Sequence, residues 1–141
     1  MVDGSGVELA SSGLSATLRD YARFGLLFLN GGKNFRGQQI LPTQWIRDSV
    51  TSDRPLITPD RDNPALSIPP GYGYQWWLPQ PSDGDYCAIG IYGQFIYVHP
   101  RYQVVIVKTS AYADYHQSGD EMEYESLAVF RSIASQMDQH P

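Results

Sequence analysis

The 141-residue sequence predicts an α+β fold, in which helices pack on one antiparallel sheet. Apolar residues recur at three- and four-residue spacing near both ends of the chain, which is typical of amphipathic helices. Between these ends, short apolar runs are separated by turns too brief for the crossover connections of parallel strands. Hydrophobic residues make up 42% of the chain, so we expect a single domain with a real core over residues 1–141.

The first helix is expected to begin near Thr17, after an extended Gly- and Ser-rich segment over residues 1–14. Ser15 or Thr17 can cap its start, because a hydroxyl oxygen accepts a hydrogen bond from the first-turn N–H groups. Asn30-Gly31-Gly32 ends it. Its predicted apolar face consists of Leu18, Tyr21, Ala22, Gly25, Phe28 and Leu29.

The next stretch is expected to contain little regular structure. Residues 33–40 are typical of a turn or hairpin, and Pro42 suits the first turn of a short helix that ends near Val50. Residues 52–70 form a long proline-rich loop, and a loop of that length in a compact domain is usually functional or disordered. Its prolines are Pro55, Pro59, Pro64, Pro69 and Pro70.

Four antiparallel strands are predicted after this loop, over residues 72–78, 86–91, 95–99 and 103–109. Trp76 and Trp77 are adjacent in the first of them, so their indoles should lie on opposite faces of the sheet. Residues 104–107 are continuously apolar, which predicts a last strand covered on both faces.

The chain is predicted to end in a second long helix. Ser118 and Glu121 have the spacing of a capping box, and the acidic residues at its start suit the positive end of the helix dipole. Its predicted buried stripe consists of Tyr124 or Leu127, Ala128 or Phe130, Ile133, Ala134 and Met137.

The turn Ile91-Tyr92-Gly93-Gln94 is the strongest candidate for a functional site. Gly93 has no side chain to fill a core, and a glycine inside a strand pattern marks a bulge or the close approach of another group to the backbone. A backbone N–H beside it, at Gln94, is of the kind that stabilises a developing oxyanion. From the local pattern, a plain bulge and an oxyanion turn both remain open.

Composition excludes several classes of function. The formal net charge is −5, with two lysines and scattered arginines, so nucleic acid is not an expected partner. No apolar run reaches the length of a membrane span, and no membrane partner is expected. The three histidines lie far apart and the single Cys87 suits a buried strand position, so we expect no metal and no other cofactor. No targeting segment is visible, and the sequence assigns no localisation.

The chain contains no recognisable nucleophile motif. No pair of glycines brackets a serine in the Gly-x-Ser-x-Gly pattern of a nucleophile elbow. Neither Lys33 nor Lys108 follows a serine by three residues, so the Ser-x-x-Lys pairing is absent as well.

Several segments in order resemble the serine β-lactamase-related hydrolases, a family that includes class C β-lactamases, penicillin-binding DD-peptidases, esterases and 6-aminohexanoate-dimer hydrolases. The resemblance runs through residues 13–32, then through Gly37-x-x-Ile40-Leu41-Pro42-x-x-Trp45-Ile46. It continues through Gly71-Tyr72-Gly73-Tyr74-x-Trp76-Trp77 and through Gly90-Ile91-Tyr92-Gly93-Gln94-Phe95-Ile96-x-Val98-x-Pro100. It covers the chain from about residue 11 to residue 135, and an ordered set of motifs is far more specific than any single one.

The resemblance implies a partial β-lactamase/transpeptidase-like fold and a serine acyl-enzyme hydrolase. Ile91-Tyr92-Gly93 stands where the family has a third motif, which is Lys-Thr-Gly in β-lactamases, and a backbone N–H at Gly93 or Gln94 would be one oxyanion donor. The missing lysine and threonine favour a small ester or amide over a β-lactam as substrate. The segment from Tyr112 to His116 would form part of the pocket rim.

The resemblance also implies that the family's first two motifs, which carry the serine, its lysine and a tyrosine, precede the part that this sequence matches. We therefore expect a C-terminal portion of such an enzyme, inactive alone because acyl transfer requires a nucleophile. Its expected partners are the N-terminal half or a second copy, bound through uncovered apolar faces. The alternatives are a non-catalytic binding module derived from the fold, and a small α+β binding domain with an accidental likeness.

Overall fold

A computed structural model describes residues 2–9, 13–52, 71–80, 83–115, 117 and 121–137. The predicted proline-rich loop lies outside the described residues, apart from Ser52. Within these residues, three helices and one sheet form an α+β arrangement, as predicted. The helices are α1 (Leu18–Leu29), α2 (Thr43–Ser49) and α3 (Glu121–Met137).

The sheet has five antiparallel strands in the order β1-β2-β3-β4-β5, so each strand pairs with its neighbours in sequence. The strands are β1 (Gly71–Tyr72), β2 (Trp77–Gln80), β3 (Asp85–Gly90), β4 (Gln94–His99) and β5 (Val104–Lys108). Consecutive strands joined by short turns give a meander, as the brief connections predicted. The β3–β4 and β4–β5 ladders run without a register shift.

The prediction of one aromatic strand over residues 72–78 is wrong. The segment divides into β1 and β2, which pair with each other through Gly71 opposite Leu78 and Tyr72 opposite Trp77. Gln75 adopts a left-handed φ of 67° in the turn between them. Gly73 lies against the carbonyl oxygen of Ser49, where a Cβ would clash. The local pattern gave no sign of this contact with the end of α2. The contact lies at the reversal of the chain between β1 and β2.

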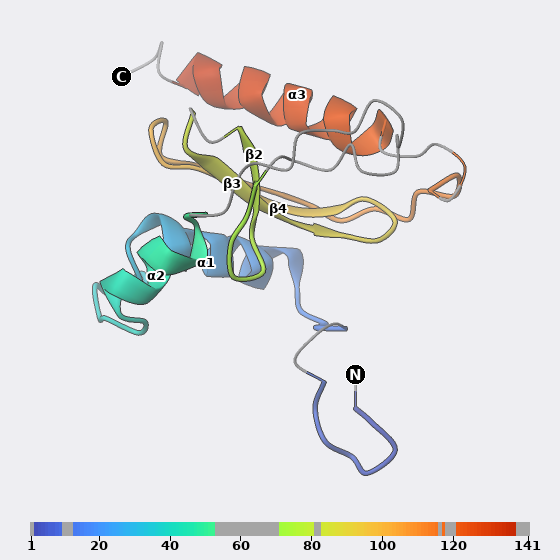
Figure 1. Ribbon diagram of the computed structural model, residues 1–141, viewed down its shortest axis with the longest axis horizontal. Coiled ribbons are helices and arrows are strands. Elements are labelled where there is room, and N and C mark those ends of the chain that lie inside the picture. Colours follow the sequence, from blue (N-terminus) through green and yellow to red (C-terminus); the bar gives the residue numbers. More distant parts are fainter. Residues whose placement is uncertain are drawn as a thin grey trace.

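The helices cover opposite faces of the sheet. Figure 1 shows α1 and α2 on one face and α3 on the other. Gly25 permits the close approach of α1, because a Cβ there would lie 2.7 Å from Cγ1 of Val105 and 3.0 Å from Cγ2 of Ile96. The predicted cap is confirmed at Thr17, whose hydroxyl accepts a hydrogen bond of 3.2 Å from the Asp20 N–H.

Two apolar clusters fill the spaces between the layers. On the α1 and α2 side, Phe28, Ile46, Trp76, Leu78, Tyr86 and Val98 are buried together. On the α3 side, the buried cluster consists of Cys87, Phe95, Tyr97, Met122, Leu127, Phe130 and Ala134. Trp77 packs on this second cluster and Trp76 belongs to the first, so the prediction of one indole on each face is confirmed. The β5 strand contributes side chains to both clusters and is covered on both faces, as expected.

The buried face of α3 differs in part from the predicted stripe. Leu127, Phe130 and Ala134 are buried as predicted, whereas Tyr124, Ile133 and Met137 are exposed. Met122, Glu123 and Ser126 are buried without having been predicted, and Met122 packs against the turn after β3. The predicted capping residues at 118–120 lie outside the described residues. Among the described helices, none is long and apolar enough to cross a membrane.

Candidate active-site turn

Residues 91–93 form a three-residue connection between β3 and β4, closed by Gly90 opposite Gln94. Tyr92 and Gly93 both have left-handed backbones, with φ of 61° and 83°. Two consecutive residues of this kind reverse the chain tightly, at a cost in strain for the tyrosine. The glycine that the sequence pattern assigned to a bulge or an oxyanion turn therefore lies in a hairpin turn. Strand β3 ends at Gly90, one residue before the predicted end at Ile91.

Gly93 is needed for packing as well as for its backbone conformation. A Cβ at this position would lie 3.1 Å from Sδ of Met122 and 3.3 Å from Cβ of Ser110. These are tighter than ordinary carbon contacts, so a side chain would displace α3 or the segment after β5. The groups that approach the glycine backbone thus belong to this chain.

The segment after β5 is tied to the turn by hydrogen bonds. The Gln94 side chain accepts a bond of 3.3 Å from the Ser110 N–H and donates one to the Ser110 carbonyl. The Tyr112 N–H donates a bond of 3.2 Å to the Tyr92 carbonyl. The Tyr92 and Tyr115 rings also lie 5.5 Å apart. The structure therefore brings Tyr112 beside the turn, whereas His116 lies outside the described residues.

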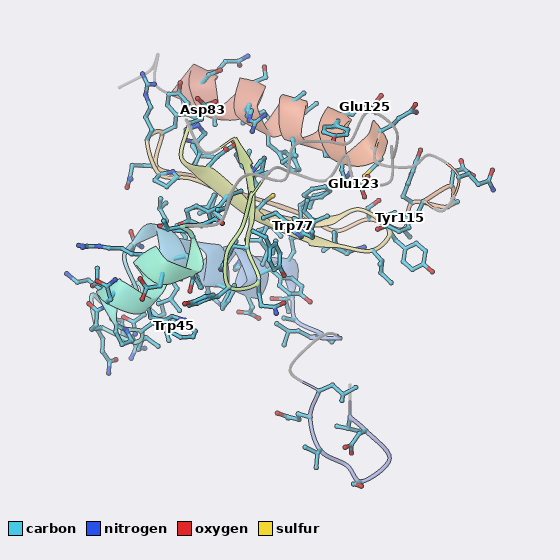
Figure 2. All side chains as sticks on the ribbon, viewed as in Figure 1. Trp45, Trp77, Asp83, Tyr115, Glu123 and Glu125 are labelled. Carbon is cyan, nitrogen blue, oxygen red and sulfur yellow. The ribbon has the colours of Figure 1, made fainter. Side chains whose placement is uncertain are left out.

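The accessible part of the turn is its first half. Ile91 is 61% exposed and Tyr92 is 41% exposed, whereas Gly93 is buried and Gln94 is half-buried. A molecule that approached this turn would meet Ile91 and Tyr92 first, with the ring of Tyr115 beside that of Tyr92. Figure 2 shows Tyr115 at this end of the sheet and Asp83 near the opposite end.

One hydroxyl is paired with a lysine. Nζ of Lys108 lies 2.9 Å from Oγ of Ser126. A serine paired with a lysine is the arrangement that a nucleophile in this chain would need, so its exposure matters. Ser126 is only 8% exposed, in the packed layer between α3 and the sheet. Nζ of Lys108 also contacts Sδ of Met122 at 3.6 Å and lies 5.5 Å from the centre of the Phe95 ring. The Lys108–Ser126 pair therefore lies within the packed layer and contributes to the contact between β5 and α3.

The far end of the sheet holds a buried ion pair. Asp85 is 1% exposed and accepts hydrogen bonds from Nε of Arg131 at 2.9 Å, from Nη2 of Arg131 at 3.4 Å and from the Tyr97 hydroxyl at 3.0 Å. Beside it lies a pocket of about 370 Å³, lined by Asp83, His99, Arg101, Tyr102, Arg131, Ser132 and Ser135. Strand β4 runs between this pair and the turn, and its length at ~3.4 Å per residue places the pair about 17 Å from the turn.

Burial changes the acid–base behaviour of several groups near this pair. It lowers the pKa of His99, against the opposing effects of Asp85 and Asp83. It raises the pKa of the Cys87 thiol, which is 0% exposed, so the prediction of a buried cysteine in a strand is confirmed. Burial also raises the pKa of the Tyr97 hydroxyl, and the neighbouring Asp85 adds to the effect. Within the described residues, no group of His, Cys, Asp and Glu is arranged to hold a metal ion.

Sequence reasoning missed the residues that hold the turn in place. Ser110 lies 16 residues after Gln94, and Met122 lies on a helix from the far end of the chain. Nothing in the local pattern links them to Gly93. The one available signal was Gln94 itself, a polar residue directly before a buried strand position.

Comparison with known proteins identifies the family. A sequence model of the beta-lactamase family matches residues 2–129. The chain is also 35% identical over 113 residues to a 6-aminohexanoate-dimer hydrolase of Paenarthrobacter ureafaciens, covering 80% of this chain and 29% of that protein. A solved structure, described as a putative 6-aminohexanoate-dimer hydrolase from Bacillus anthracis, matches with a TM-score of 0.72 and 33% identity, over 99% of this chain and 34% of the solved chain.

The chain therefore belongs to the beta-lactamase family, a family of serine hydrolases, and has the corresponding part of its fold. It spans about three tenths of the curated relative that it matches.

Proposed function

We propose that this chain forms the third-motif wall of an acyl-enzyme hydrolase for small esters or amides, on the side that stabilises the oxyanion. The observation that carries the proposal is the 91–94 turn, which lies inside the matched family region and is held rigidly by Ser110 and Met122. Fixed backbone dipoles stabilise a developing oxyanion better than mobile ones, because they need no reorganisation during the reaction.

The substrate class follows from the side chains at the turn. Ile91 and Tyr92 stand in place of a lysine and a threonine, so this wall offers no fixed cation to a carboxylate such as that of a β-lactam. Its exposed groups are an aliphatic chain and aromatic rings. The relative from Paenarthrobacter is named for hydrolysing the 6-aminohexanoate dimer, whose two units are joined by an amide bond.

In this proposal the attacking serine and its base are supplied by a segment outside these 141 residues. The sequence contains no Ser-x-x-Lys, and within the described residues the hydroxyl that bonds to Lys108, that of Ser126, is only 8% exposed. The chain alone is then inactive, because an oxyanion wall without a nucleophile forms no acyl-enzyme.

A chimera tests the proposal. The matched segment of the Paenarthrobacter 6-aminohexanoate-dimer hydrolase is replaced by this chain, and the product is assayed with the 6-aminohexanoate dimer and with a p-nitrophenyl ester. We expect hydrolysis and labelling by a fluorophosphonate probe. The same hydrolase with the segment deleted serves as the control. A folded chimera with no hydrolysis and no labelling would overturn the proposal.

The chain alone provides a second, independent test. It is incubated with the fluorophosphonate probe and digested for mass spectrometry. We expect no modified serine. A labelled serine in the 141 residues would show that the nucleophile lies within the chain.

A further inference from the structure

A lysine ammonium lies behind the 91–94 turn, on the side of the sheet that α3 covers. Lys108 is the last residue of β5 and stands opposite Phe95 in β4. Its Nζ lies 3.6 Å from Sδ of Met122, and the same sulfur atom would lie 3.1 Å from a Cβ at Gly93. Because the two contacts share one atom, Nζ lies within about 8 Å of the Gly93 backbone.

This ammonium has polar and aromatic neighbours, but no carboxylate at ion-pair distance. It donates a hydrogen bond of 2.9 Å to Oγ of Ser126 and lies 5.5 Å from the centre of the Phe95 ring. Neither of the salt bridges found among the described residues includes Lys108, and the buried carboxylate of Glu123, the next residue after Met122 on α3, forms no ion pair with it. Within the described part of the chain, no direct ion pair neutralises this charge.

Packing alone does not require a charge at this position. An ammonium in a packed layer loses part of its hydration, and without a carboxylate partner that loss is only partly offset. A methionine of similar length would occupy the same space beside Met122 and Phe95 without this cost. A charged residue where an apolar one would stabilise the fold better indicates that the charge has a function.

We propose that the Lys108 ammonium stabilises the negative charge that develops at the 91–94 turn during acyl transfer, an inference that rests on the proposed function. It acts through space from the α3 side and does not touch the substrate, whereas Ile91 and Tyr92 form the exposed side of the turn. Its contacts with α3 hold the ammonium in place, so little reorganisation is needed when the oxyanion forms. Lys108 is thus a supporting residue for the oxyanion.

The chimera described above measures this effect as a rate. Two unit charges about 10 Å apart, at an effective dielectric constant of about 20, interact strongly enough to change a rate about tenfold. We therefore expect Lys108→Met to lower kcat about tenfold with KM almost unchanged, because the oxyanion develops only on the way to the transition state. Lys108→Arg keeps the charge and should retain most of kcat. Lys33→Met, which removes the other lysine of the chain, should have no effect.

Stability separates this role from a purely structural one. Replacing a lysine that served only packing would destabilise the fold and leave kcat of the folded chimera unchanged, whereas we expect Lys108→Met to unfold at the same or a higher denaturant concentration. If Lys108→Met does not fold, Lys108→Gln, which keeps a hydrogen-bond donor for Ser126, takes its place. An unchanged kcat in a folded, active chimera overturns this inference and leaves the proposed function standing. A chimera that is inactive before any substitution at Lys108 contradicts the proposed function instead.

The electric field at the turn can also be measured on the chain alone, without hydrolysis. An Ile91→Cys variant is cyanylated in the folded state, in which Cys87 is 0% exposed and the label therefore goes to residue 91. The stretching frequency of the nitrile reports the field at that position. We expect Lys108→Met to shift this frequency and Lys33→Met to leave it unchanged. Equal frequencies with and without the Lys108 ammonium contradict the proposal.

Discussion

The side chain of Gln94 bonds to both backbone polar groups of Ser110, and this pair joins the β3–β4 turn to the segment after β5. The carboxamide acts as a strand neighbour would, because it accepts from the N–H and donates to the carbonyl. The segment that follows Ser110 also contacts Tyr92, through the Tyr112 N–H and the Tyr115 ring.

Replacing Gln94 with alanine should loosen residues 110–115. It leaves the Ser110 N–H and carbonyl without their partner, and we expect a loss of about 1–3 kcal/mol in the free energy of unfolding. Hydrogen exchange should accelerate at residues 110–115. The control is Gln44→Ala, which removes an exposed amide bonded to Asp48 on α2. Unchanged exchange at residues 110–115 would show that the carboxamide does not hold this segment.

Gly93→Ala should cost more stability than Gly84→Ala. Both glycines have left-handed backbones, with φ of 83° and 73°, so each substitution should cost roughly 1–2 kcal/mol through backbone strain. A Cβ at Gly84 meets nothing within 4 Å, whereas one at Gly93 presses on Met122 and Ser110. Chemical denaturation of the two variants measures the difference. An equal loss of unfolding free energy in both variants would mean that Met122 and Ser110 move aside without cost.

Arg131→Met should destabilise the fold strongly. Asp85 would then remain buried with only the Tyr97 hydroxyl as a described partner, and an unpaired buried charge costs about 3–5 kcal/mol. The matched control is Arg23→Met, because Arg23 and Asp20 form a pair in which both side chains are about half exposed. The midpoint temperature of thermal unfolding should fall clearly for Arg131→Met and hardly for Arg23→Met. A double variant, Asp85→Asn with Arg131→Met, should recover part of the loss.

Stability should decrease as the pH falls below about 6.5, the ordinary pKa of histidine. Burial lowers the pKa of His99 in the folded chain, so between that lowered value and 6.5 the unfolded chain binds a proton that the folded chain does not. The free energy of unfolding therefore rises with pH in this window, and part of that slope should disappear in His99→Asn. An NMR titration that places the pKa of His99 at or above 6.5 would contradict this prediction.

Local patterns predicted the elements better than the contacts between them. The α1 cap at Thr17, the end of that helix at Asn30, and strands β3 to β5 follow from propensity and spacing, which act over a few residues. The break between β1 and β2 did not, because it depends on a contact between Gly73 and the end of α2. Likewise, the pattern of α3 left alternative residues for its buried face. The burial of Met122 depends on its contact with Gly93 in the β3–β4 turn.

The sequence by itself determined the α+β class, the order of the helices and of strands β3 to β5, the likeness to the beta-lactamase family and the position of the 91–94 turn. These depend on the periodicity of side chains and on ordered motifs, which are properties of the linear chain. Only the tertiary structure decided that Gly93 lies against Met122 and that Gln94 holds Ser110. These depend on residues distant in sequence meeting in space, and the packing of the layers sets those meetings.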